Sequence, residues 1–235
     1  MPIRYPQPLR PGDGVGVTSP SSGVPRELHG RLEAAVRAVE SRGYRVQLGE
    51  CMAGEGIVSA PAEQRAAELT GMLLDPAVRA IVPPWGGELA IDLLPHLDFD
   101  ATAAAEPTWV VGFSDIATLI TPLTVLTGIA TVHGNNLMDT PYRPATGTVS
   151  WLDLVALDAG ASTSQTSPGR FRSSGWDDYA RAPGVDRMSL DATGTWERLD
   201  AEGDATFVGR LIGGCIETLC NLAGTSYGDT TAFAD

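Results

Sequence analysis

The sequence contains no lysine, so all 16 of its basic side chains are arginines, and 29 Asp and Glu residues outnumber them. The formal net charge is −13. A nucleic-acid-binding protein needs a cationic surface to displace counterions from phosphates, and an anionic membrane attracts the same kind of surface. The charge balance therefore argues against nucleic-acid and membrane partners, and it favours solubility.

Cysteine, histidine and long apolar runs are also scarce. The three cysteines (Cys51, Cys215 and Cys220) have neither the number nor the spacing of a disulfide framework or a zinc knuckle. The three histidines form no HxH or HExxH motif, so we expect no metal site. No stretch approaches the roughly 18 apolar residues of a membrane-spanning helix, and the N-terminus lacks the apolar segment of a signal peptide. These absences predict a reduced, cytoplasmic, soluble protein.

The residues that are present suit a packed α/β domain. Of 235 residues, 43% are apolar, which is enough for a sizeable core, and the length corresponds to one and a half typical domains. Short apolar segments alternate with stretches of helical periodicity. This alternation predicts a doubly wound parallel sheet with helices on both faces. The five expected strands cover residues 14–18, 44–48, 80–82, 109–111 and 129–132, and a helix is expected over 88–97.

Beyond residue 140 the pattern changes. A helix is expected over residues 150–157. Residues 161–204 are rich in Ser, Thr, Gly, Pro and Asp, which predicts an irregular connector with short strands around Trp176 and Trp196. Residues 209–220 then predict a new buried strand followed by a helix.

The segment Gly112-Phe113-Ser114-Asp115 follows the fourth expected strand and precedes a helix. A serine on a tight turn between a buried strand and a helix is typical of a nucleophile elbow, although Ile116 stands where the G-x-S-x-G pattern has its last glycine. The alternative is that Ser114 only caps the helix, which is a common role for serine. The residues alone leave both interpretations open.

Gly86 and Gly87 follow the third expected strand. Parallel strands present their carboxyl ends at one edge, so neighbouring third and fourth strands would bring the Gly87 amide close to the Ser114 hydroxyl. The amides of Gly87 and Asp115 could then form an oxyanion hole, whereas the alternatives are an ordinary glycine turn or a phosphate cradle. No GxGxxG or P-loop pattern follows a strand. His133 could act as a base, but a histidine beside Gly-Asn-Asn more often orders its loop.

Four motifs occur together in a familiar order: residues 83–88 (PPWGGE), 111–115 (VGFSD), 133–136 (HGNN) and 209–214 (GRLIGG). From residue 12 onward, the chain resembles the serine peptidases that include LD-carboxypeptidases of murein recycling and microcin C self-immunity peptidases. The resemblance implies a flavodoxin-like nucleophile domain, a connector and a C-terminal domain. It also implies a Ser-Glu-His triad without metal or cofactor, a small peptide or peptidyl-nucleotide substrate, and a homodimer.

The resemblance assigns roles to individual residues. Ser114 matches the nucleophile, and the amides of Gly87 and Asp115 match the oxyanion donors. Residues expected near the substrate cleft are Trp85, Gly86, Glu88 and Trp176.

One departure concerns the rest of the triad. In the family the Glu and His lie downstream of the Gly-Gly strand and helix, whereas Glu217 does not match that glutamate and no histidine follows His133. We therefore expect the front two thirds of such an enzyme: a nucleophile domain over 1–145, a helix and connector over 146–204, and the start of a C-terminal catalytic domain over 205–235. A noncatalytic α/β module that binds an anion or nucleotide is the alternative, and a flavin-binding enzyme is a third possibility.

Overall fold

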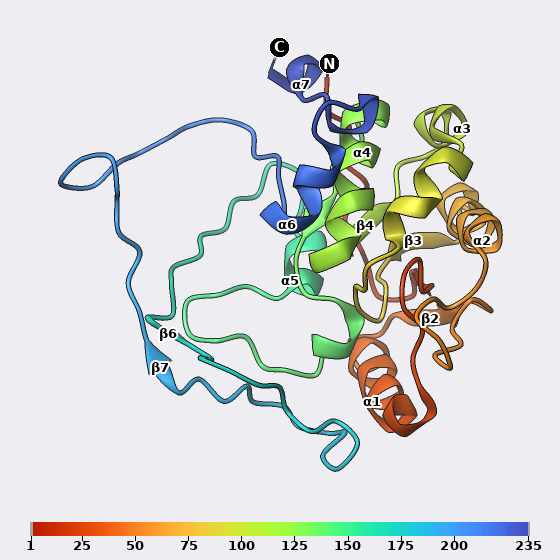
Figure 1. Cartoon of the computed structure of the whole chain (residues 1–235), viewed down its shortest axis with the longest axis horizontal. Helices are drawn as coiled ribbons and strands as arrows, with labels where there is room; N and C mark the ends of the chain where they lie inside the picture. The colour runs from red at the N-terminus through yellow and green to blue at the C-terminus, as the bar shows by residue number, and fades with distance from the viewer. Residues whose placement is uncertain (1, 235) are drawn as a thin grey trace.

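A five-stranded parallel sheet forms the centre of the molecule. The structure is a computed structural model and describes residues 2–234. The strands are paired in the order β2-β1-β3-β4-β5, which is the flavodoxin-like order and confirms the expected fold class (Figure 1). Their bounds are β1 (Gly14–Val17), β2 (Arg45–Leu48), β3 (Val78–Ile81), β4 (Trp109–Gly112) and β5 (Val132–His133).

Helices cover both faces of this sheet. On one face, α1 (His29–Glu40) and α5 (Trp151–Val155) share a core with alternate strand residues such as Val15 and Val17. On the other, α2 (Ala62–Leu74) and α4 (Ala117–Thr127) share a core with Ile81 and Val110. The short helix α3 (Phe99–Ala104) packs beside α2 and α4. The period-2 alternation of side chains along each strand separates the two cores.

Two elements differ from the sequence prediction near the carboxyl edge. The segment expected as a helix over 88–97 is the 3₁₀ helix η2 (Ala90–His96), and Pro95 lies within it, where it cannot donate an α-helical hydrogen bond. The fifth strand was expected over 129–132, but only Val132 of that stretch belongs to β5. Ile129 instead forms a parallel bridge with Arg4 near the N-terminus.

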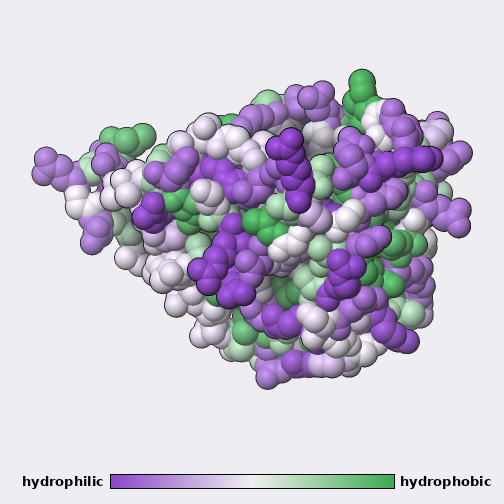
Figure 2. Space-filling view, turned by 90° about the horizontal axis from the view of Figure 1, so that it is seen from below, coloured by the Kyte–Doolittle hydropathy of each residue, from purple (hydrophilic) through white to green (hydrophobic). Residues whose placement is uncertain are grey.

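The connector has little regular structure. Its strands are β6 (Arg170–Phe171) and β7 (Ala192–Thr193), which pair antiparallel, so the prediction of strands around Trp176 and Trp196 was wrong in position. Both tryptophans lie at the surface, 82% and 91% exposed. Figure 2 shows this part of the chain as an arm projecting from the left of the molecule.

Residues 209–220 were expected to form a buried strand followed by a helix; the helix is present, and the strand prediction was wrong. Within residues 205–234 the structure has no strand, and Phe207, Val208 and Leu211 are 89–98% exposed because no element packs on them. The helix α6 (Ile216–Leu219) lies against α4, and Leu222 is buried in the core that α2 and α4 share. The remaining short helices are η5 (Cys220–Leu222), η6 (Ser226–Gly228) and α7 (Thr231–Ala234).

None of the helices described between residues 2 and 234 combines the length and apolar character needed to cross a bilayer.

The packing predicts how strongly alanine substitutions on α4 affect stability. Leu119 is 1% exposed, whereas Leu126 on the same helix is 37% exposed. We expect Leu119→Ala to lower the free energy of unfolding by about 2–5 kcal/mol, because it leaves a cavity in the core. Leu126→Ala, the matched control, is expected to change it by less than about 1 kcal/mol. Urea unfolding followed by circular dichroism measures both, and equal losses would contradict the assignment of the buried face.

Candidate active site

The turn after β4 has an unusual backbone. Ser114 has a φ of 61°, and every other residue with positive φ between residues 2 and 234 is a glycine. A left-handed conformation costs a residue with a Cβ about 1–2 kcal/mol. Gly112 is also constrained, because a Cβ there would lie 2.6 Å from Ile116 Cγ2. The chain therefore passes from β4 into η3 (Ser114–Ile116) through a sharp, strained turn.

The Ser114 side chain is half-buried and does not cap the helix. Phe113 is the N-cap of η3, Ile116 is the N-cap of α4, and neither cap has a side-chain hydrogen bond. The Ser114 hydroxyl has no hydrogen-bond partner within residues 2–234. The capping interpretation was therefore wrong, and the turn leaves this hydroxyl unengaged.

The Gly86–Gly87 loop lies directly against this turn because β3 and β4 are neighbours in the sheet. A Cβ on Gly86 would lie 3.1 Å from Ser114 Oγ and 3.0 Å from Asp115 N. Gly87 has a φ of 152°, and a Cβ there would lie 2.2 Å from Ser21 Oγ, in the loop after β1. The glycines thus allow close approach of three loops, beyond what an ordinary turn requires.

A buried carboxylate joins these loops. Asp115 is 3% exposed, and its Oδ2 accepts hydrogen bonds from Ser21 Oγ at 2.6 Å and from the Ala90 amide at 2.8 Å. Ser21 Oγ in turn lies 3.3 Å from the Leu89 amide that donates to it. One carboxylate thereby links the loops after β1, β3 and β4.

Arg65 on α2 reinforces the same junction. It is 2% exposed and donates to the carbonyl oxygens of Pro20 and Leu89, one in the loop after β1 and the other in the loop after β3. Arg65 could not be singled out from the sequence, because an arginine on a helix is normally a solvated side chain.

A third set of contacts comes from the segment after β5. This segment leads into the 3₁₀ helix η4 (Leu137–Asp139). Asn136 is 2% exposed, and its Oδ1 accepts a hydrogen bond from the Phe113 amide at 3.1 Å. The amides of Leu137 and Met138 donate to the carbonyl oxygens of Pro83 and Pro84, at 2.9 and 3.0 Å. The sequence had suggested this loop only through its HGNN motif.

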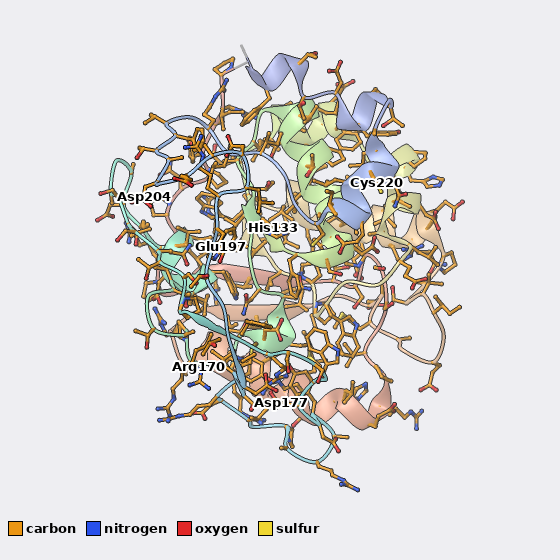
Figure 3. All side chains as sticks on the ribbon, turned by 60° about the vertical axis from the view of Figure 1, so that its left-hand side comes forward. His133, Arg170, Asp177, Glu197, Asp204 and Cys220 are labelled. Atoms are coloured by element: carbon orange, nitrogen blue, oxygen red, sulfur yellow. The ribbon has the colours of Figure 1, made fainter. Side chains whose placement is uncertain are left out.

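His133 lies at the end of β5, beside α6 (Figure 3). Its Nε2 is 3.8 Å from Cys215 Sγ, and partial desolvation lowers its pKa below the ordinary value. A Cβ on Gly214 would lie 3.6 Å from the His133 ring and 2.7 Å from Ala117 Cβ. The segment around Cys215 therefore packs beside the start of α4, and sequence reasoning had not placed this thiol near the site.

The expected cleft residues divide into two groups. Trp85 is anchored by its Nε1, which donates to the carbonyl oxygens of Ser22 and Gly23 at 3.2 and 3.1 Å, and Glu88 is exposed beside it. Trp176 lies on the connector with 82% of its surface exposed, and its indole N–H has no hydrogen-bond partner among residues 2–234. The structure thus brings Gly86, Gly87, Ser114 and Asp115 together but does not pack Trp176 against them. No group of three His, Cys, Asp or Glu side chains suited to a metal ion occurs in the described part of the chain.

Comparison with known proteins identifies the family. Residues 15–134, which include the Ser114 turn and all of the sheet except Gly14 of β1, match the model of the LD-carboxypeptidase N-terminal domain. The chain belongs to the LD-carboxypeptidase family. Relatives include a Vibrio cholerae protein classed among the carboxypeptidases, 27% identical over 95% of this chain and 66% of that protein. The murein tetrapeptide carboxypeptidase of Pseudomonas aeruginosa is 32% identical over 54% of this chain and 41% of that protein.

A microcin C7 self-immunity protein, MccF, is similar in both sequence and fold. The Escherichia coli protein is 28% identical over 56% of this chain and 38% of its own length. A solved structure of MccF in the apo state superimposes with a TM-score of 0.76 and 23% identity, covering 94% of this chain and 66% of that one. The likeness shows that the α/β fold is shared. The chain spans 66% or less of the length of these relatives.

The strained turn predicts that two substitutions at Ser114 differ in stability. We expect Ser114→Gly to have a free energy of unfolding about 1 kcal/mol higher than Ser114→Ala, because glycine adopts a φ of 61° without a Cβ clash. Chemical denaturation of the two variants measures this difference. A more stable alanine variant would contradict the left-handed backbone.

The neighbourhood of His133 predicts an NMR result. We expect its imidazole to titrate with a midpoint below about 6.5, because desolvation disfavours the charged ring. Alkylation of Cys215, in a Cys220→Ser background where Cys51 is buried, should shift the His133 ring resonances. The His96 resonances serve as the control, and shifts of equal size at both rings would contradict the proximity of Cys215.

Proposed function

We propose that this chain is the nucleophile-bearing part of a metal-independent serine peptidase of the LD-carboxypeptidase type. The observation that carries the proposal is the strained turn at Ser114, whose unengaged hydroxyl lies against Gly86. A residue held in a sparsely populated backbone conformation indicates function more often than chance. Membership of the LD-carboxypeptidase family supports the same reaction class.

In the proposed reaction, Ser114 Oγ attacks the carbonyl carbon of the bond that holds the last amino acid. A histidine accepts the hydroxyl proton, and a glutamate orients that histidine. The amides of Gly87 and Asp115 donate hydrogen bonds to the oxyanion of the tetrahedral intermediate. The histidine then protonates the departing amino group, and water hydrolyses the resulting acyl-enzyme by the reverse sequence of proton transfers.

We propose that the histidine and the glutamate lie in the part of the relatives' length that the match does not cover. His133 is a weaker candidate for the base, because its Nε2 faces Cys215 Sγ at 3.8 Å. Under this proposal residues 1–145 form the nucleophile domain, 146–204 the helix and connector, and 205–235 the start of the catalytic C-terminal domain. The exposed apolar side chains of Phe207, Val208 and Leu211 suit a surface that such a domain would cover.

The substrate we propose is a small peptide or a peptidyl nucleotide, cleaved in the cytoplasm by a homodimer of the complete enzyme. Two relatives support this range. The Pseudomonas protein is named as a murein tetrapeptide carboxypeptidase, and a structure of MccF contains aspartyl sulfamoyl adenosine. Both compounds present an amino-acyl group with a carbonyl for attack. We place Trp85, Gly86 and Glu88 along the cleft, whereas the same role for Trp176, exposed on the connector, stays a prediction.

The test uses this chain alone and fused to the C-terminal third of the Vibrio relative. We expect negligible cleavage of an LD-tetrapeptide or an aspartyl-adenylate analogue by the chain alone, because loss of the base removes orders of magnitude in rate. The fusion should cleave one of them. Ser114→Ala should abolish that activity, and Ser41→Ala, which alters an exposed serine after α1, should not.

Normal turnover by the chain alone, lost in Ser114→Ala, would contradict the placement of the base. Full activity of the Ser114→Ala fusion would contradict the nucleophile. Nucleotide binding without cleavage by the fusion would favour the noncatalytic module instead.

A further inference from the structure

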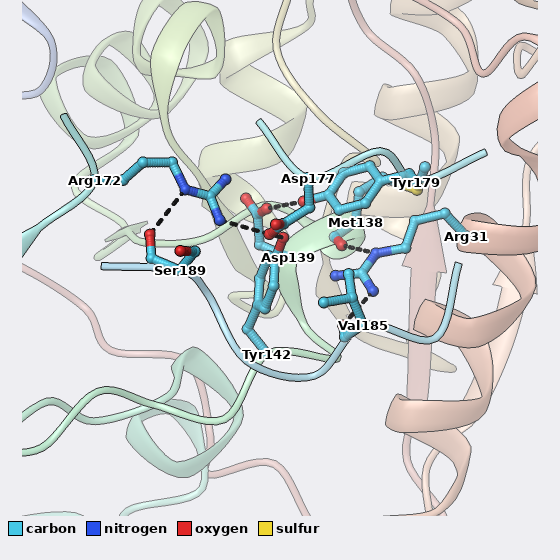
Figure 4. Close-up of polar contacts among 9 residues, drawn as sticks. All are labelled: Arg31, Met138, Asp139, Tyr142, Arg172, Asp177, Tyr179, Val185 and Ser189. Carbon is cyan, nitrogen blue, oxygen red and sulfur yellow. Dashed lines mark hydrogen bonds and ion pairs between the residues drawn. The ribbon is translucent and has the colours of Figure 1, made fainter. Parts of the chain in front are cut away.

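Arg31 is a buried cation at the junction of three segments. It lies on α1 and is 0% exposed. Its Nε donates to the Met138 carbonyl in η4 at 2.8 Å, and its Nη1 donates to the carbonyls of Pro183 and Val185 in the connector at 3.0 and 2.7 Å (Figure 4). One guanidinium thus bonds α1, η4 and the connector at once.

The environment of Arg31 is costly for a charge. Within residues 2–234 no carboxylate hydrogen-bonds to it, although its charge acts on the nearby carboxylates of Asp139 and Asp177. Its Nη2 has no hydrogen-bond partner and is the one such buried side-chain atom among the described residues. Burying a charge without a hydrogen-bonded anion is destabilising. The rings of Tyr142 and Tyr179, with centroids 4.8 and 4.3 Å from the guanidinium carbon, offset part of that cost through cation–π contact. Because burying this charge is costly, we attribute the position of Arg31 to the three segments it joins and not to a gain in folding free energy.

Within the connector, Arg31 binds residues 177–185, the part that packs against the α/β domain. Asp177 accepts hydrogen bonds from Tyr142 and from Arg172, the latter at 2.6 Å. Tyr179 OH donates to Asp139 in η4 at 3.1 Å. Trp176 directly precedes this docked stretch. By contrast, residues 161–169 and 194–209 are mostly exposed.

On the other side, Arg31 reaches the candidate active site through a single short segment. Met138, whose carbonyl Arg31 binds, donates its amide to Pro84, just before the Gly86–Gly87 loop. Two residues earlier, Asn136 Oδ1 holds the Phe113 amide beside Ser114. The segment 136–138 therefore contacts both loops of the site and, through Arg31, the connector.

We propose that Arg31 is a positioning residue that couples docking of connector residues 177–185 to the order of the Ser114 and Gly86–Gly87 loops. It touches no reacting atom; it acts through Met138 and Asn136. Its effect on catalysis rests on the proposed function, whereas the coupling between connector and loops does not.

The test compares Arg31→Ala with Arg42→Ala, a control that removes an exposed arginine two residues beyond the end of α1, where it pairs with Asp153. In Arg31→Ala we expect trypsin to cut after Arg172, whose side chain is 12% exposed, about ten-fold faster than in the wild type. Hydrogen exchange should also increase at the amides of Phe113 and Met138. Arg42→Ala should change neither rate.

Chemical rescue separates positioning from a general loss of stability. Methylguanidinium, which fills the space vacated by the Arg31 side chain, should restore both protease protection and exchange rates in Arg31→Ala. Cleavage after Arg65, within α2, should stay at the wild-type rate throughout. If Arg31→Ala does not fold, Tyr179→Leu replaces it, because this variant removes one of the two rings that contact Arg31. Its protease cleavage and hydrogen exchange are then compared with those of the wild type.

The proposal would be overturned by unchanged exchange at Phe113, by equally faster cleavage after Arg65, or by lack of rescue in a folded variant. If Ser114 of the wild-type fusion reacts with a fluorophosphonate, that rate should fall in Arg31→Ala and return with methylguanidinium. Failure of the wild-type fusion to react or to cleave would count against the proposed function alone, and the exchange measurement would still decide the role of Arg31.

Discussion

The Asp115 carboxylate is the contact on which the geometry of the candidate site depends. By accepting from Ser21 Oγ and the Ala90 amide, it fixes the loops after β1 and β3 to the turn after β4. Those loops follow strands whose order is set by the two hydrophobic cores, so the sheet brings them near each other and the carboxylate fixes their spacing. In the proposed mechanism the same residue contributes its amide to the oxyanion hole. One residue thus serves the scaffold with its side chain and the reaction with its backbone.

Arg65 and Arg31 extend this arrangement outward in opposite directions. Arg65 binds carbonyls of the loops after β1 and β3 from α2, below one face of the sheet, and Arg31 binds η4 and the connector from α1 on the other face. Both are buried and bond mainly to carbonyl oxygens. Carbonyls at loop ends are groups that regular secondary structure leaves unpaired, and a guanidinium can satisfy several of them from one position.

The sequence was sufficient to predict the sheet, because its apolar segments are short, separated by helical periodicity and bounded by Gly and Pro. The Gly112–Asp115 turn was also recognisable as a candidate nucleophile elbow, although the residues alone left helix capping by Ser114 as an alternative. The fifth strand was misplaced because Ile129 is buried through a bridge to Arg4 and not through β5. The helix expected over 88–97 is a 3₁₀ helix instead, because Pro95 cannot donate an α-helical hydrogen bond. The apolar periodicity of this segment was given more weight than the proline. The buried arginines could not be predicted, because their partners are backbone carbonyls, which every residue possesses.

The contrast between a tightly fixed centre and a loosely attached arm bears on how such chains diverge over generations. A Cβ at Gly112 would collide with Ile116 and one at Gly86 would crowd the Ser114 turn, whereas residues 161–169 and 194–209 are mostly exposed. Substitutions in the centre are therefore expected to destabilise the fold, whereas most substitutions in these exposed segments are expected to cost little. Where selection follows stability, descendants of one ancestor would keep the Ser114 turn and differ mainly in the exposed segments beside it.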